Sequence, residues 1–247
     1  MGVYAIEEHF TKELLSVNNR QAGPILKIAE TGYWEVTQKE KLDNQSYQNN
    51  LPIYDACVIE PFGKKRILNS PSLKQAFLKG QNLLYKFKNG SCNVDSLLQL
   101  DKLAKLYAIA DLGKILHGIA THNQRWYYDP KENRLEPIAY DLCSNDRFED
   151  EQRSPLYGFK SDHTIDIHSK RDIIPFLPFN SSLFNEKYFQ YLNQYSRIAF
   201  LDSVFHILED DLIKCEKLIQ ENDILYAFDK EYYYHNAKRI RMALGQY

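Results

Sequence analysis

The chain has 247 residues, 44% of them hydrophobic, which suits a globular protein with a substantial core and excludes global disorder. A formal net charge of -2 and the lack of any lysine and arginine run make nucleic acid an unsuitable partner. Because no apolar run reaches the roughly 20 residues of a membrane-spanning helix, we expect no transmembrane segment.

The sequence leaves the localisation open. The cysteines are far apart and form no CxxC or zinc spacing, so free thiols are expected; they are Cys57, Cys92, Cys143 and Cys215. No basic and apolar leader precedes Val3, and the chain as written has the character of a soluble protein. It opens, however, on residues 3–6, which have the pattern of an interior strand. Such a start is typical of a fragment of a longer, exported or surface protein.

The front of the chain alternates short strands with one helix. We predict strands at residues 3–6, 24–30 and 56–61, a helix at 9–17, and a long polar surface loop at 37–52. Lys27 lies in the second of these strands, where it is well placed to enter a cleft. The overall prediction is an α+β fold with a strand-rich part at residues 1–65 and a mainly helical part at 66–247.

Longer helices follow. Ser70 as N-cap and Pro71 in the first turn start a helix that stops at Asn89-Gly90. A second helix, apolar on more than one face, runs from about Asp95 to His117-Gly118 and is expected to be the buried spine of this part. A hairpin with strands at 125–129 and 135–140 comes next, then an irregular stretch at 143–162 and helices at 191–219 and 228–244.

Asn123 and Asp141 stand at the two ends of this hairpin. An amide oxygen and a carboxylate oxygen are ligands that Mg²⁺ accepts, and the metal completes its octahedron with water and phosphate oxygens. The order helix, Asn, hairpin, Asp is also the order of the metal ligands in kinase-like folds. The simpler alternative is an Asn and an Asp that cap surface turns.

Two stretches carry a family resemblance. The segment HGIATHNQRWYYDPKENRLEPIAYD, residues 117–141, resembles the spore coat protein H (CotH) kinase family, in which an Asn is followed by aromatics, a turn and an apolar strand that ends on Asp. GVYAIEEHFTKELL and GPILK, at residues 2–15 and 23–27, resemble that family's strand, Glu, helix and Lys-bearing strand. The resemblance covers residues 2–146 and implies an atypical protein-kinase-like fold that transfers phosphate from Mg-ATP to Ser or Thr of a protein substrate.

The resemblance also implies residue roles. Asn123 and Asp141 would hold Mg²⁺, and Lys27 would contact the nucleotide phosphates, oriented by Glu8 or Glu30. A solvated strand lysine is the alternative for Lys27. Two parts of the usual kinase pattern are missing: no GxG motif occurs, and Gly118 stands where the catalytic Asp is expected.

Without that Asp, His117 is the candidate general base, with His122 nearby and Asp111 earlier on the helix. An imidazole can accept a hydroxyl proton near neutral pH, and such help is worth about 10² to 10⁴ in rate. A histidine that only pairs with the helix C-terminus is the alternative. Two non-catalytic possibilities also stay open: a pseudokinase-like binding module, and a cell-surface interaction protein that uses its many aromatic side chains.

The cluster Asp162, His163, Asp166 and His168 matches no closed zinc pattern and is expected to be a solvated loop.

Overall fold

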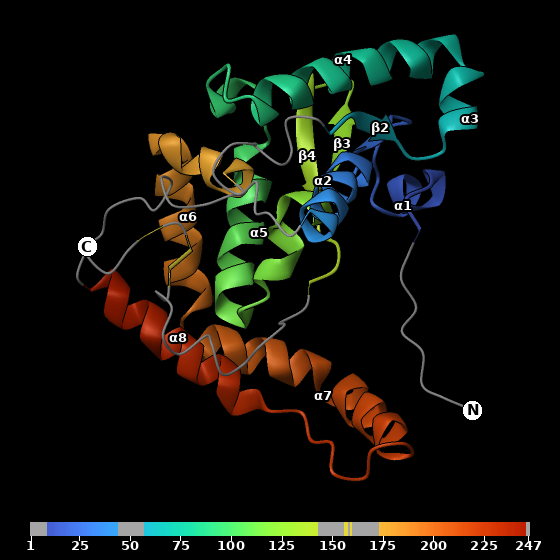
Figure 1. The fold of residues 1–247 in the computed structure, drawn as a ribbon. Helices are drawn as coiled ribbons and strands as arrows, with labels where there is room; N and C mark the ends of the chain where they lie inside the picture. The colour runs from blue at the N-terminus through green and yellow to red at the C-terminus, as the bar shows by residue number, and fades with distance from the viewer. Residues whose placement is uncertain (1–8, 44–56, 143–155, 158, 160–172, 246–247) are drawn as a thin grey trace.

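The computed structural model describes residues 9–43, 57–142, 156–157, 159 and 173–245. Within these ranges the chain is α+β, with a small antiparallel sheet and a mainly helical remainder (Figure 1). The predicted strand at residues 3–6, Glu8, most of 143–162 and the Asp162 to His168 cluster lie outside them. None of the described helices has the length and apolar character that crossing a membrane requires.

The sheet has the strand order β2-β1-β3-β4, with every neighbouring pair antiparallel. The strands are β1 (Ile25–Ile28), β2 (Ile59–Pro61), β3 (Arg125–Asp129) and β4 (Arg134–Ile138). The strands predicted at 24–30 and 56–61 are therefore present with shorter bounds. The predicted hairpin is present too, with its first strand at the predicted residues 125–129 and its second at 134–138 in place of 135–140. Residues before position 65 supply two strands, and residues after it supply the other two, so the sheet joins both parts of the chain.

One face of the sheet packs against α4 (Pro71–Lys88). Trp126 and Phe87 meet edge to face with their ring centroids 5.5 Å apart. The helix approaches so closely at Gly80 that an added Cβ would lie 2.8 Å from the Cβ of Tyr128. Ser70 caps this helix, accepting a hydrogen bond from the backbone N–H of Leu73, as the sequence predicts. The helix α3 (Lys64–Leu68) leads into α4.

The other face of the sheet carries α1 (Lys12–Val17), whose Leu15 packs on Ile25 and Tyr127. Charged residues share this face further along the strands. Lys27 pairs with Arg125 across β1 and β3, and with Glu60 across β1 and β2. Because directly paired residues project to the same side of a sheet, these three side chains lie on one face.

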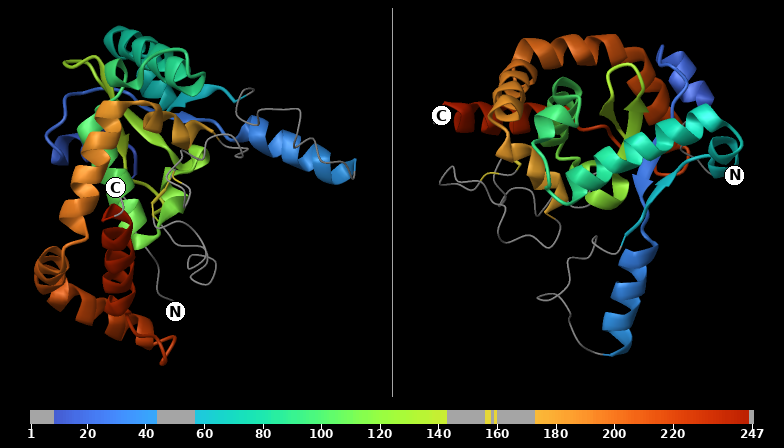
Figure 2. Two further views of the ribbon diagram at one scale, coloured as in Figure 1. Left: turned by 90° about the vertical axis from the view of Figure 1, so that its left-hand side faces the viewer. Right: turned by 90° about the horizontal axis from the view of Figure 1, so that it is seen from above.

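The surface loop predicted at residues 37–52 is partly wrong, because residues up to 42 belong to α2 (Thr31–Leu42), and 44–52 lie outside the described residues. The helix extends away from the sheet (Figure 2), and its apolar residues are not gathered on one side, so it shows no apolar periodicity. Residues 38–42 of this helix are good helix formers, and Trp34 Nε1 donates to Glu30 Oε2 at 2.9 Å, one turn earlier.

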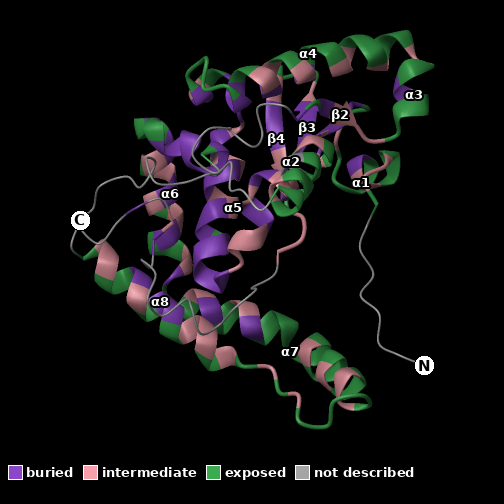
Figure 3. Ribbon diagram, in the orientation of Figure 1, coloured by how far each residue is buried: buried purple, intermediate pink, exposed green. Residues whose placement is uncertain are grey.

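The buried spine is α5 (Leu100–Gly113), preceded by the short 3-10 turn η1 (Val94–Ser96). It packs against α6 (Ser182–Tyr195) and α8 (Lys230–Leu244) and is mostly buried (Figure 3). The prediction that this helix reaches residue 118 is wrong. It ends at Gly113 because Lys114 adopts the left-handed conformation (φ 50°), and the short turns η2 (Leu116–Ile119) and η3 (Thr121–Asn123) follow.

The helix predicted at 191–219 is two helices, since the chain turns at Ser196 and Arg197 between α6 and α7 (Ile198–Gln220). The predicted last helix is confirmed as α8. Another 3-10 segment, η4 (Ile174–Asn180), lies against α6. Aromatic rings fill the space between α5, α6 and η4; they include Tyr107, Tyr157, Phe179, Phe184 and Tyr188.

Candidate functional site

Asn123 and Asp141 lie side by side. The amide Nδ2 of Asn123 donates to Asp141 Oδ2 at 3.2 Å and to the carbonyl oxygen of His117 at 3.1 Å. Asn123 is only 4% exposed, whereas the side chain of Asp141 is 37% exposed. The turn η3 fixes the first residue, and the exit from β4 fixes the second, where Asp141 itself takes a left-handed backbone conformation (φ 49°). An Asp tolerates this conformation better than most residues.

His117 completes a three-residue cluster. Its Nε2 lies 3.1 Å from Asp141 Oδ2, and its ring meets that of His122 edge to face at 5.1 Å. The imidazole is 27% exposed, so its outer side faces solvent. A carboxylate bonded to one imidazole nitrogen fixes the ring's orientation. The arrangement therefore holds the imidazole in one orientation beside the carboxylate.

Gly118 is closed to any side chain. A Cβ built there would lie 2.8 Å from the carbonyl oxygen of Tyr140 and would collide with the side chain of Leu142. Both neighbours belong to the segment that holds Asp141. An Asp, such as the catalytic one of protein kinases, therefore has no room at this position. The space that its side chain would need is filled by residues 140–142, which approach η2 closely.

Lys27 lies on β1, on the sheet face that also bears Arg125, and its Nζ is 5.5 Å from the ring centroid of Phe62. Among the described residues, Lys27 and Asp141 form no hydrogen bond or ion pair with each other. The structure therefore does not join the predicted phosphate-contacting lysine to the predicted metal ligand. Glu30, the other predicted partner of Lys27, accepts a hydrogen bond from Trp34 instead.

Arg125 is the residue that sequence reasoning missed. It is 6% exposed, and its guanidinium stacks on Tyr140 at 4.4 Å and lies 5.6 Å from Phe62. One NH1 donates to the carbonyl oxygens of His122 at 2.7 Å and Gln124 at 3.1 Å. Desolvation lowers the pKa of Arg125, although a guanidinium keeps its proton at any pH where the protein is folded.

Arg125 influences how far apart Asn123 and Asp141 lie. Arg125 holds the residue before Asn123 through a hydrogen bond and the residue before Asp141 through ring stacking. It thereby sets the separation of the two side chains. In the sequence, Arg125 is only an arginine at the start of a strand, directly after the candidate loop. Many solvated arginines occur in such positions, so the sequence does not reveal this role.

Asp141 opens onto a cavity of about 280 Å³, whose other walls are mostly apolar: Phe10, Leu14, Ile138, Ala139, Tyr140 and Leu142. The cavity makes the carboxylate accessible to a cation. No group of three or more His, Cys, Asp or Glu suited to a metal occurs among the described residues. An Asn and Asp pair is outside that definition, and it is the pair that Mg²⁺ accepts when phosphates and water supply the other ligands.

The amide of Asn123 faces Asp141 with its nitrogen. Turning the amide by half a revolution brings Oδ1 to the same side and gives up both hydrogen bonds of Nδ2, to the carbonyl oxygen of His117 and to Asp141 Oδ2. The assignment of amide nitrogen and oxygen follows from hydrogen bonding alone. The donor set therefore fits a cation after one side-chain rotation, which costs the two hydrogen bonds of Nδ2.

Asp111, the third candidate base, lies elsewhere. It is fully buried on α5 and accepts hydrogen bonds from the Tyr188 hydroxyl and from the backbone N–H of Tyr157 at 3.1 Å. Burial raises its pKa to about 6, against the opposing effects of Lys114 and these hydrogen bonds. Its partners are in the aromatic core between α5 and α6, so Asp111 serves that core and is not part of the Asn123 cluster.

Comparison of the sequence with protein-family models and with curated proteins gives no match.

Proposed function

We propose that the chain is an atypical protein kinase of the CotH type, with a kinase-like α+β fold, that transfers phosphate from Mg-ATP to Ser or Thr of a protein. The observation that carries the proposal is the convergence of Asn123, Asp141 and His117, with Asp141 Oδ2 within 3.2 Å of the amide and 3.1 Å of the imidazole. Two side chains from separate turns, those of Asn123 and His117, meet at one partly exposed oxygen of the third residue, Asp141. Residues that only cap surface turns do not require such a convergence.

Each residue has a distinct role. Mg²⁺, held by Asn123 and Asp141, would neutralise charge on the nucleotide phosphates. Lys27 and the nearby Arg125 provide positive charge on one sheet face, and Lys27 is the more exposed of the two. His117, oriented by Asp141, would accept the proton of the acceptor hydroxyl. Phosphoryl transfer depends mostly on positioning and charge, so the lack of an Asp at position 118 slows such a reaction without removing its basis.

A non-catalytic nucleotide-binding module is the second candidate, and Gly118 favours it. The carbonyl of Tyr140 leaves no space for an Asp side chain at position 118. A module that binds nucleotide without transferring phosphate does not need that Asp. The two candidates share the nucleotide site and differ only in transfer.

Thermal unfolding with Mg-ATP tests the shared part. A ligand that binds only the native state stabilises it by about 2.7 kcal/mol at a concentration of 100 times Kd. We expect a rise in Tm with Mg-ATP that is lost in Asp141→Ala and kept in Asp210→Ala, a matched change at an exposed carboxylate on α7. No rise in the unmodified protein would refute both candidates and leave an interaction protein.

Transfer of labelled phosphate then separates the two. In a kinase, His117→Ala keeps the Tm rise and loses about 10² to 10⁴ in transfer rate. A binding module shows the Tm rise with no transfer in either protein.

A further inference from the structure

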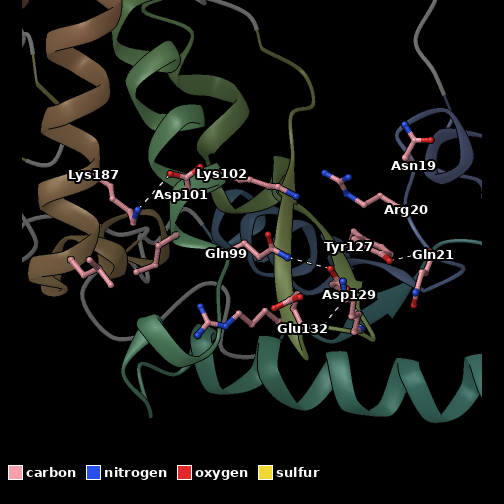
Figure 4. A pocket seen from close by; sticks show the side chains of 14 residues that line it. Asn19, Arg20, Gln21, Gln99, Asp101, Lys102, Tyr127, Asp129, Glu132 and Lys187 are labelled. Atoms are coloured by element: carbon pink, nitrogen blue, oxygen red, sulfur yellow. Dashed lines mark hydrogen bonds and ion pairs between the residues drawn. The ribbon is translucent and has the colours of Figure 1, made fainter.

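A second, larger cavity of about 640 Å³ lies at the tip of the β3-β4 hairpin (Figure 4). Asp141 follows the other end of this hairpin, after β4. Its walls come from the loop before β1, the first turn of α5, the hairpin tip and α6. Five side chains of this lining are cations, and three are carboxylates: Arg20, Lys102, Lys131, Arg134 and Lys187 against Asp101, Asp129 and Glu132. A fourth carboxylate, Glu136, lies beside the lining and pairs with Arg20 and Lys102. This local excess of positive charge stands out in a chain whose net charge is -2.

Two carboxylates, Asp101 in the lining and Glu136 beside it, are each shared by two cations. Glu136 receives the forked guanidinium of Arg20, with NH2 at 2.7 Å from Oε1, and Lys102 at 2.5 Å from Oε2. Asp101 receives Lys105 at 2.9 Å and Lys187 at 3.5 Å. One carboxylate neutralises one cation, so each pairing leaves a positive charge without a full counter-charge.

These cations are also partly removed from water. The side chains of Arg20, Lys102 and Lys187 are 31%, 34% and 31% exposed. Attraction between charges is stronger in such places than on an open surface. An acidic segment that enters the cavity therefore meets two incompletely neutralised ammonium groups, that of Lys102 beside Glu136 and that of Lys187 beside Asp101. It needs no rearrangement of the Arg20 and Glu136 pair.

The amide side chains indicate the kind of ligand. Asn19, Gln21 and Gln99 line the same cavity, and amides pair with the N–H and C=O groups of a peptide backbone (Figure 4). Of these, Gln99 donates to Asp129 Oδ2 at 3.3 Å and keeps its carbonyl oxygen as a further acceptor. Most residues of the lining are polar or charged, and Leu100, Tyr127 and Leu183 are its apolar and aromatic members, whereas sites that enclose drug-sized ligands are predominantly apolar.

We propose that this cavity binds an acidic peptide segment of a partner protein, with neighbouring carboxylates or a phosphorylated side chain in contact with Lys102 and Lys187. The inference does not rest on nucleotide binding, because the cavity and Asp141 lie at opposite ends of the hairpin. The negative groups of the acidic segment form ion pairs with the two ammonium groups, and its backbone forms hydrogen bonds with the amide side chains.

Fluorescence anisotropy tests the proposal with a short labelled peptide of consecutive glutamates, its phosphoserine counterpart, and a glutamine peptide of equal length. Both anionic peptides bind and the glutamine peptide does not. The double variant Lys102→Gln with Lys187→Gln weakens binding by about tenfold or more, since two charge-assisted contacts are lost. The double variant Lys214→Gln with Lys217→Gln, which removes the same charge from the exposed surface of α7, changes affinity by less than about twofold.

Unfolding curves show whether the double variant stays folded. If its Tm falls, Lys187→Gln alone serves, because Asp101 keeps Lys105 at 2.9 Å and the Tyr191 hydroxyl at 2.6 Å; this variant weakens binding by about threefold or more.

Several results would overturn the proposal. Equal weakening by both double variants means non-specific charge attraction, and binding of the glutamine peptide means that charge is not recognised. Displacement by inorganic phosphate at the same concentration as the phosphopeptide means a small-anion site only. No binding of either anionic peptide also overturns it. Asp141→Ala keeps full peptide affinity, so failure of the nucleotide site and failure of the peptide site are separate results.

Discussion

The fully buried carboxyl of Asp111 makes the stability of this protein depend on pH in an unusual direction. Desolvation raises its pKa from 3.8 to about 6. The folded chain therefore binds this proton more tightly than the unfolded chain does. The stability that it contributes is fully present below about pH 4 and is lost as the pH rises through 6. Most carboxylates, whose pKa is lowered on folding, have the opposite effect.

The magnitude follows from the two pKa values. A difference of about two units corresponds to about 3 kcal/mol in the free energy of unfolding, because one unit is worth about 1.4 kcal/mol. Asp111→Asn removes this dependence, since an amide does not ionise. The variant can keep both contacts: its Oδ1 accepts from the N–H of Tyr157, and its Nδ2 donates to the Tyr188 hydroxyl, which reverses its role.

The assay is denaturant unfolding of wild type and Asp111→Asn at a series of pH values from about 4 to 7.5. The free energy of unfolding of the variant relative to wild type should rise by about 3 kcal/mol across this range. Asp210→Asn, at an exposed carboxylate, controls for the general effect of losing one charge and should give a nearly flat difference. A flat difference for Asp111→Asn would refute the claim that burial dominates its ionisation.

Two further predictions concern the Asn123 and Asp141 pair. Gly118→Ala forces its Cβ against the carbonyl of Tyr140, so it should lower the free energy of unfolding by about 1–3 kcal/mol and reduce the Mg-ATP effect on Tm. Gly245→Ala, where the nearest atoms are 3.5 Å away, should lower the free energy of unfolding far less. Equal losses in the two variants would contradict the close approach at Gly118. Arg125→Lys keeps the charge but loses the planar stacking on Tyr140, so the free energy of unfolding should fall by about 1–3 kcal/mol. Arg241→Lys, on the exposed face of α8, should show no such loss. An unchanged stability of Arg125→Lys would show that any cation at position 125 holds the two segments.

Local signals explain what the sequence predicted well. Ser70-Pro71 and Asn89-Gly90 mark both ends of α4, because capping and left-handed glycine depend on near neighbours only. The hairpin of β3 and β4 is likewise encoded in its turn. The convergence of Asn123 and Asp141 followed from their places on either side of that hairpin, which brings its two ends together.

Other features depend on tertiary contacts. The helix α2 has no apolar stripe to reveal it, and α5 ends at Gly113 although apolar residues continue beyond it. The role of Arg125 arises from Tyr140 and the carbonyl of His122, which only the folded chain brings to it. The sharing of Glu136 by Arg20 and Lys102 joins residues from three separate segments, a pairing that sequence spacing does not disclose.

The position of β1 inside the sheet has a consequence for synthesis on the ribosome. Ile25 pairs with Tyr127, so one edge of β1 lacks its partner strand until about 100 further residues have been made. At about 5–20 residues per second, this delay is roughly 5–20 s. During that time the nascent chain carries an apolar strand with an open edge, which is a site for a chaperone or for aggregation. Release of a chain truncated before β3 would make this exposure permanent.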